Sequence, residues 1–388
     1  MAERTRGAGS AGRPPSVLIA NPSADVYGAD LQLLESITGL VDAGATVRVC
    51  VPSDGPLVPM LRARGAAVQF VASPVVRRSA LSSKGLAALV GGNLTGVARL
   101  VRLLRRLRPD VVLVNTVTIP AWIAAARIAR VPVLVHVHEA EDSDNRWVLK
   151  GLLAPLLGAS GLIVNSKAAA AALTSVYPRL HRRISLIYNG IPDVPPAPAP
   201  PTPDPETFRL AAVCRLSPRK APDVAIEAVA LLRTAGVPAV LTIYGTPFAG
   251  YEWYQQQLKE RAAQPDLAGA VTLAGYVSPI WEALAAADAV LAPSLREPFG
   301  NAVVEAQFAR RPVVAAAAMG HLETVNDGET GLLVEPGDAA AMAAAVQRLI
   351  DDPALAARLA ERGRQWAVER FSVHRYRRDI AGIVLKSH

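Results

Sequence analysis

The side chains of this sequence that could carry out chemistry gather at a strand-to-helix turn in its second half. The segment AVLAPSLREPFGNAVVEA is typical of a strand, a loop and a helix that begins at about Gly300. Glu297 lies in the loop, and Glu305 follows it in the helix. The start of a helix presents free amide groups and a partial positive charge, which suit a phosphate. We therefore expect an anion site at this turn.

The two glutamates have separate roles in this interpretation. At 1.5 Å of rise per residue, they are about 12 Å apart along a helix axis and cannot share a proton. Each carboxylate could accept hydrogen bonds from a different part of an elongated, polyhydroxylated ligand. Taken alone, such a pair is also compatible with ordinary surface carboxylates.

A second charged cluster follows the first strand of the same half. The strand FRLAAVC leads into RLSPRK, which places Arg215 and Lys220 at another strand-to-helix turn. A guanidinium and an ammonium group suit a diphosphate leaving group, because they stabilise its developing charge. The second half of the chain contains neither G-x-G-x-x-G nor G-x-x-x-x-G-K-[ST], which weighs against a dinucleotide dehydrogenase and against an NTPase.

The elements that must position these residues alternate along the whole chain. Short apolar runs such as PSVLIANP, DVVLVNT, VPVLVHVHE, AVLTIYG and RPVVAAA are separated by helical stretches rich in Ala and Leu. Continuous apolar strands between helices are typical of a parallel sheet covered on both faces. The pattern predicts an α/β fold with two doubly wound, Rossmann-like domains facing a central cleft, where the strand carboxyl ends bind ligands.

A length of 388 residues fits two domains better than one. The segment PDVPPAPAPPTPDPE is too rich in proline for regular structure and is interpreted as a linker. We predict a flexible tail over residues 1–15, a first Rossmann-like domain over 16–191, the linker over 192–206, a second domain over 207–370 and a terminal helix over 371–388.

The composition excludes several classes of protein. No run approaches the roughly 18–20 apolar residues of a membrane-spanning helix, and the first residues lack the apolar segment of a secretory signal. Cys50 and Cys214 lie far apart, so we expect neither a disulfide scaffold nor a zinc site. We expect a cytoplasmic protein.

Positive charge is concentrated in the first half of the chain. Residues 1–190 carry 22 Lys and Arg against 11 Asp and Glu; the remainder carries 41 − 22 = 19 against 33 − 11 = 22, and the whole chain is at +8. The sharpest source is a predicted helix from Leu94 to Arg108, which contains Arg99, Arg102, Arg105, Arg106 and Arg108. This cluster of arginines predicts contact with an anionic membrane surface or an anionic acceptor. The alternative is that the arginines form an ordinary solvent-exposed helix face. No aromatic residue interleaves with these arginines, so we expect no nucleic-acid partner.

In combination, the motifs resemble glycosyltransferase family four, the retaining, sugar-nucleotide-dependent enzymes of GT-B fold marked by Glu-x7-Glu. The resemblance covers nearly the whole chain and rests, in order, on VYGADLQLLES, VHE, YNGIP, RLSPRK, IYG, AGYV and EPFGNAVVEA. It implies a retaining transfer of a hexose from a nucleotide diphosphate sugar to a hydroxyl of a glycan or lipid-linked acceptor, in polysaccharide or glycolipid assembly. It implies that the domain over 16–191 lies on the acceptor side, that the domain over 207–370 binds the nucleotide sugar, and that the helix over 371–388 crosses back to the first domain. It implies no cofactor and no metal.

The resemblance also implies roles for individual residues. Arg215 and Lys220 would bind the donor diphosphate, Glu297 the sugar hydroxyls and Glu305 the ribose hydroxyls. His138 would be the active-site histidine near the reacting carbon. Further donor contacts would come from the backbone amides of Phe299, Gly300 and Asn301, from Gly28 in the first domain, and from nucleobase walls at Gly245, Tyr276 and Val277.

Some features depart from the family pattern or leave other functions open. Met319–Gly320 stands where the family often has Gly-Gly, and YGAD replaces the commoner Gly-Gly-Ala-Glu, which puts the donor sugar in doubt. Asp142-Ser143-Asp144 has the spacing of a metal-binding D-x-D motif but is expected to face acceptor or solvent. A sugar-nucleotide epimerase, a phosphorylase-like enzyme with a pyridoxal lysine, and a catalytically silent sugar-nucleotide-binding protein remain alternatives.

Overall fold

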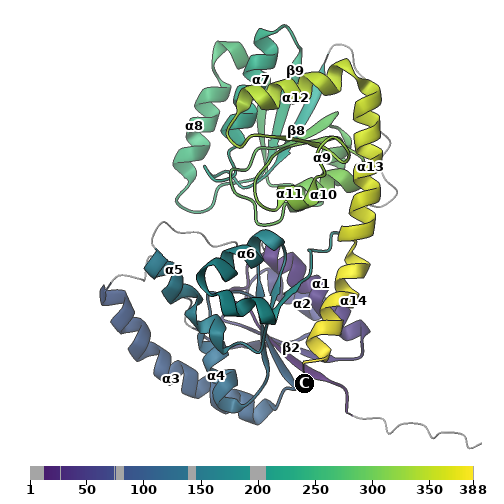
Figure 1. The fold of residues 1–388 in the computed structure, drawn as a ribbon. Coiled ribbons are helices and arrows are strands. Elements are labelled where there is room, and N and C mark those ends of the chain that lie inside the picture. Colours follow the sequence, from purple (N-terminus) through teal and green to yellow (C-terminus); the bar gives the residue numbers. More distant parts are fainter. Residues whose placement is uncertain are drawn as a thin grey trace, which may run out of the picture. The chain divides into compact units, whose positions relative to one another are not determined.

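The computed structural model describes residues 13–26, 28–73, 75, 83–138, 146–192 and 207–387, with the backbone alone at 83–94 and 146. The chain divides into two compact units, each described by itself (Figure 1). Unit 1 takes the described residues within Met1–Val137, Ser143–Ile163 and Arg377–His388, and unit 2 takes those within His138–Asp142 and Val164–Tyr376. The D-x-D segment and nearly all of the predicted tail and linker lie outside the described residues.

The first sheet has seven strands in the order β3-β2-β1-β4-β5-β6-β7. The central strand β1 pairs in parallel with β2 and with β4. The strands are β1 (Ser16–Ala20), β2 (Thr46–Val51), β3 (Ala67–Phe70), β4 (Val111–Val114), β5 (Val133–Val137), β6 (Gly161–Val164) and β7 (Ile184–Leu186). The helices among them are α1 (Gly28–Asp42), α2 (Leu57–Ala63), α3 (Ser83–Leu107), α4 (Ala121–Ala129), α5 (Arg146–Leu153) and α6 (Lys167–Val176), with short 3-10 turns η2 (Ala154–Gly158) and η3 (Pro178–Arg183).

The second sheet has six parallel strands in the order β10-β9-β8-β11-β12-β13. They are β8 (Phe208–Val213), β9 (Ala239–Tyr244), β10 (Val271–Gly275), β11 (Ala289–Ala292), β12 (Val313–Ala316) and β13 (Leu332–Val334). Its helices are α7 (Pro222–Thr234), α8 (Glu252–Ala262), η4 (Pro265–Leu267), α9 (Trp281–Ala285), α10 (Asn301–Phe308), α11 (His321–Thr324), α12 (Ala339–Asp351) and α13 (Pro353–Phe371), followed by α14 (Val373–Leu385).

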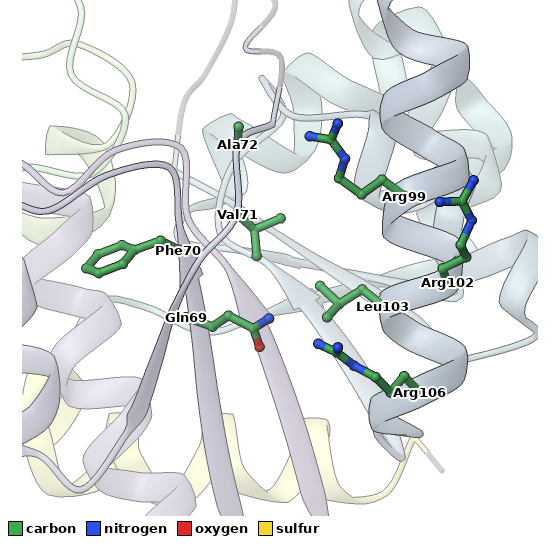
Figure 2. Close-up of a pocket in the computed structure, with 8 residues that line it drawn as sticks. All are labelled: Gln69, Phe70, Val71, Ala72, Arg99, Arg102, Leu103 and Arg106. Atoms are coloured by element: carbon green, nitrogen blue, oxygen red, sulfur yellow. The ribbon is translucent and has the colours of Figure 1, made fainter.

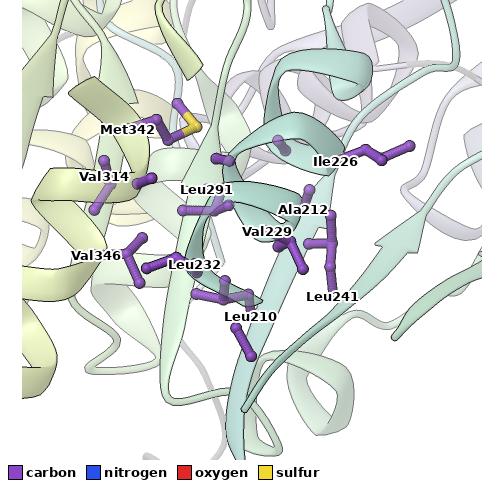
Figure 3. Packing of buried hydrophobic residues seen from close by; sticks show 14 of the residues in the cluster. Leu210, Ala212, Ile226, Val229, Leu232, Leu241, Leu291, Val314, Met342 and Val346 are labelled. Atoms are coloured by element: carbon purple, nitrogen blue, oxygen red, sulfur yellow. The ribbon is translucent and has the colours of Figure 1, made fainter. Parts of the chain in front are cut away.

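Both faces of the second sheet are buried, as the apolar strands predict. Leu210 and Ala212 of β8 join a cluster with residues of α7 and α12, whereas Ala211 joins a second cluster with residues of α9 and α10. Figure 3 shows Val229 of α7 and Val346 of α12 in the first cluster. Successive strand side chains point to opposite faces, so this alternation requires helices on both sides. The predicted α/β, doubly wound fold class is confirmed.

Helix α3 differs from its predicted bounds at both ends. It begins at Ser83, about a dozen residues before the predicted start, and its backbone stays helical through Gly91 and Gly92. It ends at Leu107, because Arg108 has a left-handed φ of 47° and precedes Pro109, which disfavours a helical residue before it. Within the described residues, no helix is both long and apolar enough to span a membrane.

Candidate functional site

The candidate site lies at the point in the second sheet where the strand order reverses. The chain leaves β8 to form β9 on one side, and later returns to place β11 on the other side. The loops after β8 and β11 therefore diverge at the carboxyl edge, which is where open α/β sheets bind ligands. The loop after β8 carries Arg215 and Lys220, and the loop after β11 carries Glu297.

Backbone and side-chain contacts join these two loops. The amide of Leu295 donates to the carbonyl of Arg219 at 3.0 Å, which holds the loops side by side. The ammonium of Lys220 forms an ion pair with Glu297, whose side chains are only 17% and 15% exposed. The hydroxyl of Ser294 donates to the same carboxylate oxygen at 3.4 Å. The structure thus brings together two predicted site residues that are far apart in the sequence.

The charge of Glu297 is stabilised by its surroundings. Burial alone would raise its pKa, but the positive charge and hydrogen bond of Lys220, with a smaller contribution from Arg219, outweigh burial and lower the pKa. The carboxylate is therefore ionised at neutral pH and can accept hydrogen bonds from sugar hydroxyls. The ion pair also leaves donors available, because an ammonium group has three.

The predicted helix start is confirmed, and the first turn lacks a side-chain cap. Gly300 is the N-cap of α10, with a left-handed φ of 107°, and no described side chain caps this helix. A Cβ at Gly300 would lie 2.8 Å from Cδ2 of His321, so the chain passes too close for any other residue. The amides at the start of α10 thus present partial positive charge three residues beyond Glu297.

The buried side chain of His321 lies against this turn. Its Nδ1 donates to the carbonyl of Ala316 at 2.9 Å, and burial lowers its pKa, against a raising effect of Glu297, so the ring is neutral. The amide of Gly320 donates to the carbonyl of Glu297 at 2.8 Å. A Cβ at Gly320 would lie 2.4 Å from Cα of Phe299, so this approach requires glycine. The loop that carries Glu297 is therefore held from two sides.

Arg215 is held by the loop after the neighbouring strand β9. Its guanidinium donates to the hydroxyl of Thr246 at 3.0 Å and lies over the ring of Phe248, 4.8 Å from the centroid. Gly245 allows this close approach, because a Cβ there would lie 1.8 Å from the carbonyl oxygen of Cys214. A guanidinium stacked on an aromatic ring keeps its orientation without losing its charge.

Glu305 lies on α10, half-buried, and burial raises its pKa to about 7. No described side chain pairs with its carboxylate. Because only residues 301–305 of the Glu297–Glu305 interval are helical, the predicted separation of 12 Å along a helix axis does not apply. Asn301 accepts a hydrogen bond from the side-chain amide of Asn189 at 2.9 Å.

The other predicted site residues differ in how far their side chains are exposed. Tyr276 and Val277 follow β10 and are 62% and 38% exposed, so they are open to a ligand. The ring of Phe299 is buried against Phe371, which leaves only its backbone for donor contacts. His138 follows β5, and burial lowers its pKa to about 4, so its imidazole is neutral at pH 7.

Gly28 belongs to unit 1, where it is the first residue of α1 after the central strand β1. A buried polar network supports this turn. Asn115 donates to Asn21 at 2.8 Å, and Asn21 donates to Asp30 at 2.8 Å. These three residues flank the strand-order reversal between β1 and β4, the counterpart of the position described in unit 2.

Sequence reasoning missed four residues that complete the site in unit 2. They are Ser294 and His321 around Glu297, and Thr246 and Phe248 around Arg215. The signal that could have found them is their position, because each follows the end of a strand on the same edge of the sheet.

Two family models match the chain. "Glycosyltransferase Family 4" matches residues 26–194, and "Glycosyl transferases group 1" matches residues 197–366. The site residues of unit 2 from Arg215 to Glu305 all lie within the second match.

Individual proteins show the same similarity. D-inositol 3-phosphate glycosyltransferase of Pseudarthrobacter chlorophenolicus is 36% identical over 207 residues, which cover 51% of this chain and 49% of that protein. Glycogen synthase of Mycobacterium tuberculosis is 32% identical over 274 residues, or 67% of this chain and 65% of that protein. The matched region thus spans about half to two thirds of these curated relatives.

Among solved structures, HepE of Anabaena in complex with UDP and glucose superimposes with a TM-score of 0.80. It is 25% identical, and the match covers 96% of this chain and 99% of that chain. The predicted family and its GT-B fold are confirmed by these matches. The chain belongs to glycosyltransferase family 4.

Proposed function

We propose that this protein is a retaining hexosyltransferase that uses a nucleotide diphosphate sugar and transfers the sugar to a hydroxyl of a glycan or lipid-linked acceptor. The observation that carries the proposal is the half-buried Lys220–Glu297 ion pair beside the uncapped start of α10 and the stacked guanidinium of Arg215. The similar HepE structure contains UDP and glucose, which supports a nucleotide sugar as the donor.

In this proposal, the residues of unit 2 stabilise the departing diphosphate. Arg215 and Lys220 donate to its oxygens, and the amides of Phe299, Gly300 and Asn301 supplement them. Charges fixed in place before the reaction stabilise negative charge as it develops, without the cost of reorganisation. The charge that a metal would otherwise supply comes from these groups, so we propose that the reaction needs no metal.

The other site residues hold the donor. Glu297 remains ionised and accepts hydrogen bonds from sugar hydroxyls, whereas Glu305 accepts from the ribose. Gly245, Tyr276 and Val277 surround the nucleobase, and Gly28 of unit 1 allows a backbone approach to the diphosphate. The neutral His138 can donate one hydrogen bond to the sugar near its reacting carbon.

The experiment is a thermal-shift screen against nucleotide sugars, beginning with UDP sugars, followed by turnover with lipid-linked and soluble acceptors. We expect one donor class to raise the melting temperature and to be consumed with an acceptor present. Glu297→Ala is expected to abolish turnover. Donor consumption without an acceptor would instead indicate an epimerase or hydrolase, and unchanged biological activity of Glu297→Ala would indicate a silent binding protein.

We propose in addition that α3 contacts the anionic inner face of a membrane, which would suit a lipid-linked acceptor and an assembly role in polysaccharide or glycolipid synthesis. Arg102 and Arg105 are exposed on this helix, and Arg108 is exposed directly after its end. Between Asp54 and Asp110 the chain has no acidic residue, so nothing in this stretch offsets their charge.

Charge reversal tests the membrane contact. Arg105→Glu combined with Arg108→Glu is expected to reduce cosedimentation with vesicles of phosphatidylcholine and phosphatidylglycerol by about tenfold or more, since each basic residue near an anionic surface contributes about 1 kcal/mol. The matched control is Arg179→Glu with Arg182→Glu, which removes the same charge from η3. Equal binding by the α3 variant and the unchanged protein would exclude the contact.

A further inference from the structure

Unit 1 contains a hollow of about 360 Å³ that the donor chemistry does not use. It lies between the end of the edge strand β3 and the second half of α3 (Figure 2). Its wall on one side is the segment from Gln69 to Ala72, and on the other side it is the α3 face formed by Arg99, Arg102, Leu103 and Arg106. Sites for small molecules begin at about 300 Å³.

The geometry of both walls is fixed by secondary structure. Phe70 pairs with Val51 of β2, and the amide of Val71 donates to the carbonyl of Val51 at 2.8 Å. These contacts fix the position of the strand segment that forms this wall. On α3, residues 99, 102, 103 and 106 follow the spacing that places side chains on one helix face. Leu103 is only 8% exposed and anchors that face to the core.

The rim of the hollow is cationic. Figure 2 shows Arg99 and Arg106 reaching across toward the strand segment, at the two ends of the hollow. Within the described residues, none of the three arginines forms an ion pair with a carboxylate. The absence of acidic residues from 55 to 109 means that no neighbour in sequence competes for them. Guanidinium groups arranged in this way match the oxygens of a phosphate, which they can bind in a bidentate manner.

The floor is apolar. Leu103 and Val71 lie between the arginines, whereas the ring of Phe70 points away from α3 on the other side of the strand segment (Figure 2). An apolar floor between cationic side chains suits a ligand with an apolar portion next to its charge. An inorganic anion would leave this surface exposed to water.

We propose that this hollow, the α3 groove, binds an organic phosphate monoester, with the phosphate between Arg99 and Arg106 and the organic portion against Leu103 and Val71. Such a group could come from a lipid headgroup or from a soluble phosphate ester. The proposal does not rest on the donor site, and it is separate from the diffuse membrane contact because it needs two particular arginines.

Isothermal titration calorimetry of the full chain at physiological salt tests binding to the α3 groove. Salt at this concentration screens long-range attraction between exposed charges, so the binding that remains comes from close contacts. The probes are dihexanoyl phosphatidic acid below its micelle concentration, glycerol 3-phosphate, and dihexanoyl phosphatidylcholine as the zwitterionic control. We expect phosphatidic acid to bind at least about tenfold more tightly than phosphatidylcholine, because the monoester carries more negative charge and a third free oxygen, whereas the single charge of the phosphodiester is offset by its choline cation. Weaker binding of glycerol 3-phosphate would indicate a lipid source, and equal binding would indicate a soluble ester.

A matched pair of double variants separates the groove from general charge. Arg99→Gln with Arg106→Gln removes two charges from the groove, and Arg105→Gln with Arg108→Gln removes two from the end of α3 and the residue after it, outside the groove. We expect the first pair to weaken phosphatidic acid binding by about tenfold or more and the second by less than about twofold. Equal losses in the two double variants, or equal affinity for the two lipids, would overturn the proposal.

Discussion

Lys220→Ala is expected to lower donor turnover by about 10²–10³-fold, the range measured when one preorganised donor to a developing negative charge is removed. The substitution removes a cation from the proposed diphosphate site and leaves the carboxylate of Glu297 without its main partner. The lost positive charge also removes the effect that keeps the pKa of Glu297 low. The effect should appear in kcat as well as in donor affinity.

The double variant Lys220→Gln with Glu297→Gln distinguishes catalysis from stability. It removes both charges of the pair, so it should regain most of the melting temperature lost in Lys220→Ala, because no unpaired charge stays buried. Turnover should stay low. Lys259→Ala, on the exposed surface of α8, is the matched control for loss of a lysine. Lys220→Ala with a normal melting temperature and near-normal turnover would exclude Lys220 from the site.

Gly245→Ala is expected to destabilise the protein by about 2–5 kcal/mol, through steric overlap and backbone strain together. An added Cβ would lie 1.8 Å from the carbonyl oxygen of Cys214, and the residue has a φ of 150°. The ends of β8 and β9 would have to separate, and this would move the loop in which Thr246 and Phe248 hold Arg215.

Gly236→Ala supplies the control for backbone strain alone. Gly236 has a φ of 86°, but nothing lies within 4 Å of a Cβ built there. Urea denaturation should therefore give a loss of about 1–2 kcal/mol for this variant, the cost of a left-handed alanine. A comparable loss for both variants would show that the close approach of Gly245 to Cys214 has no energetic consequence.

The sequence alone predicts the sheet architecture, because parallel strands buried on two faces need long apolar runs. The start of α10 is predicted for a related reason, since the glycine at its N-cap and the preceding loop form a recognisable strand-to-helix turn. The start of α3 is missed, because Gly91 and Gly92 have low helix propensity and argue against a continuous helix.

Within the site, residue types are easier to predict than their partners. Lys220 and Glu297 are each assigned to a different part of the donor from the sequence, yet they form an ion pair that depends on the pairing of β8 with β11. The contact of His321 with Gly300 is likewise tertiary. The spacing of residues along the chain contains no information on which loops a sheet brings together.

A crystal structure of the protein with a bound nucleoside diphosphate tests the central claim most directly. The account predicts diphosphate oxygens at about 3 Å from the side chains of Arg215 and Lys220 and from the amides at the start of α10. A diphosphate bound elsewhere, with these groups still in contact only with protein or solvent, would contradict it.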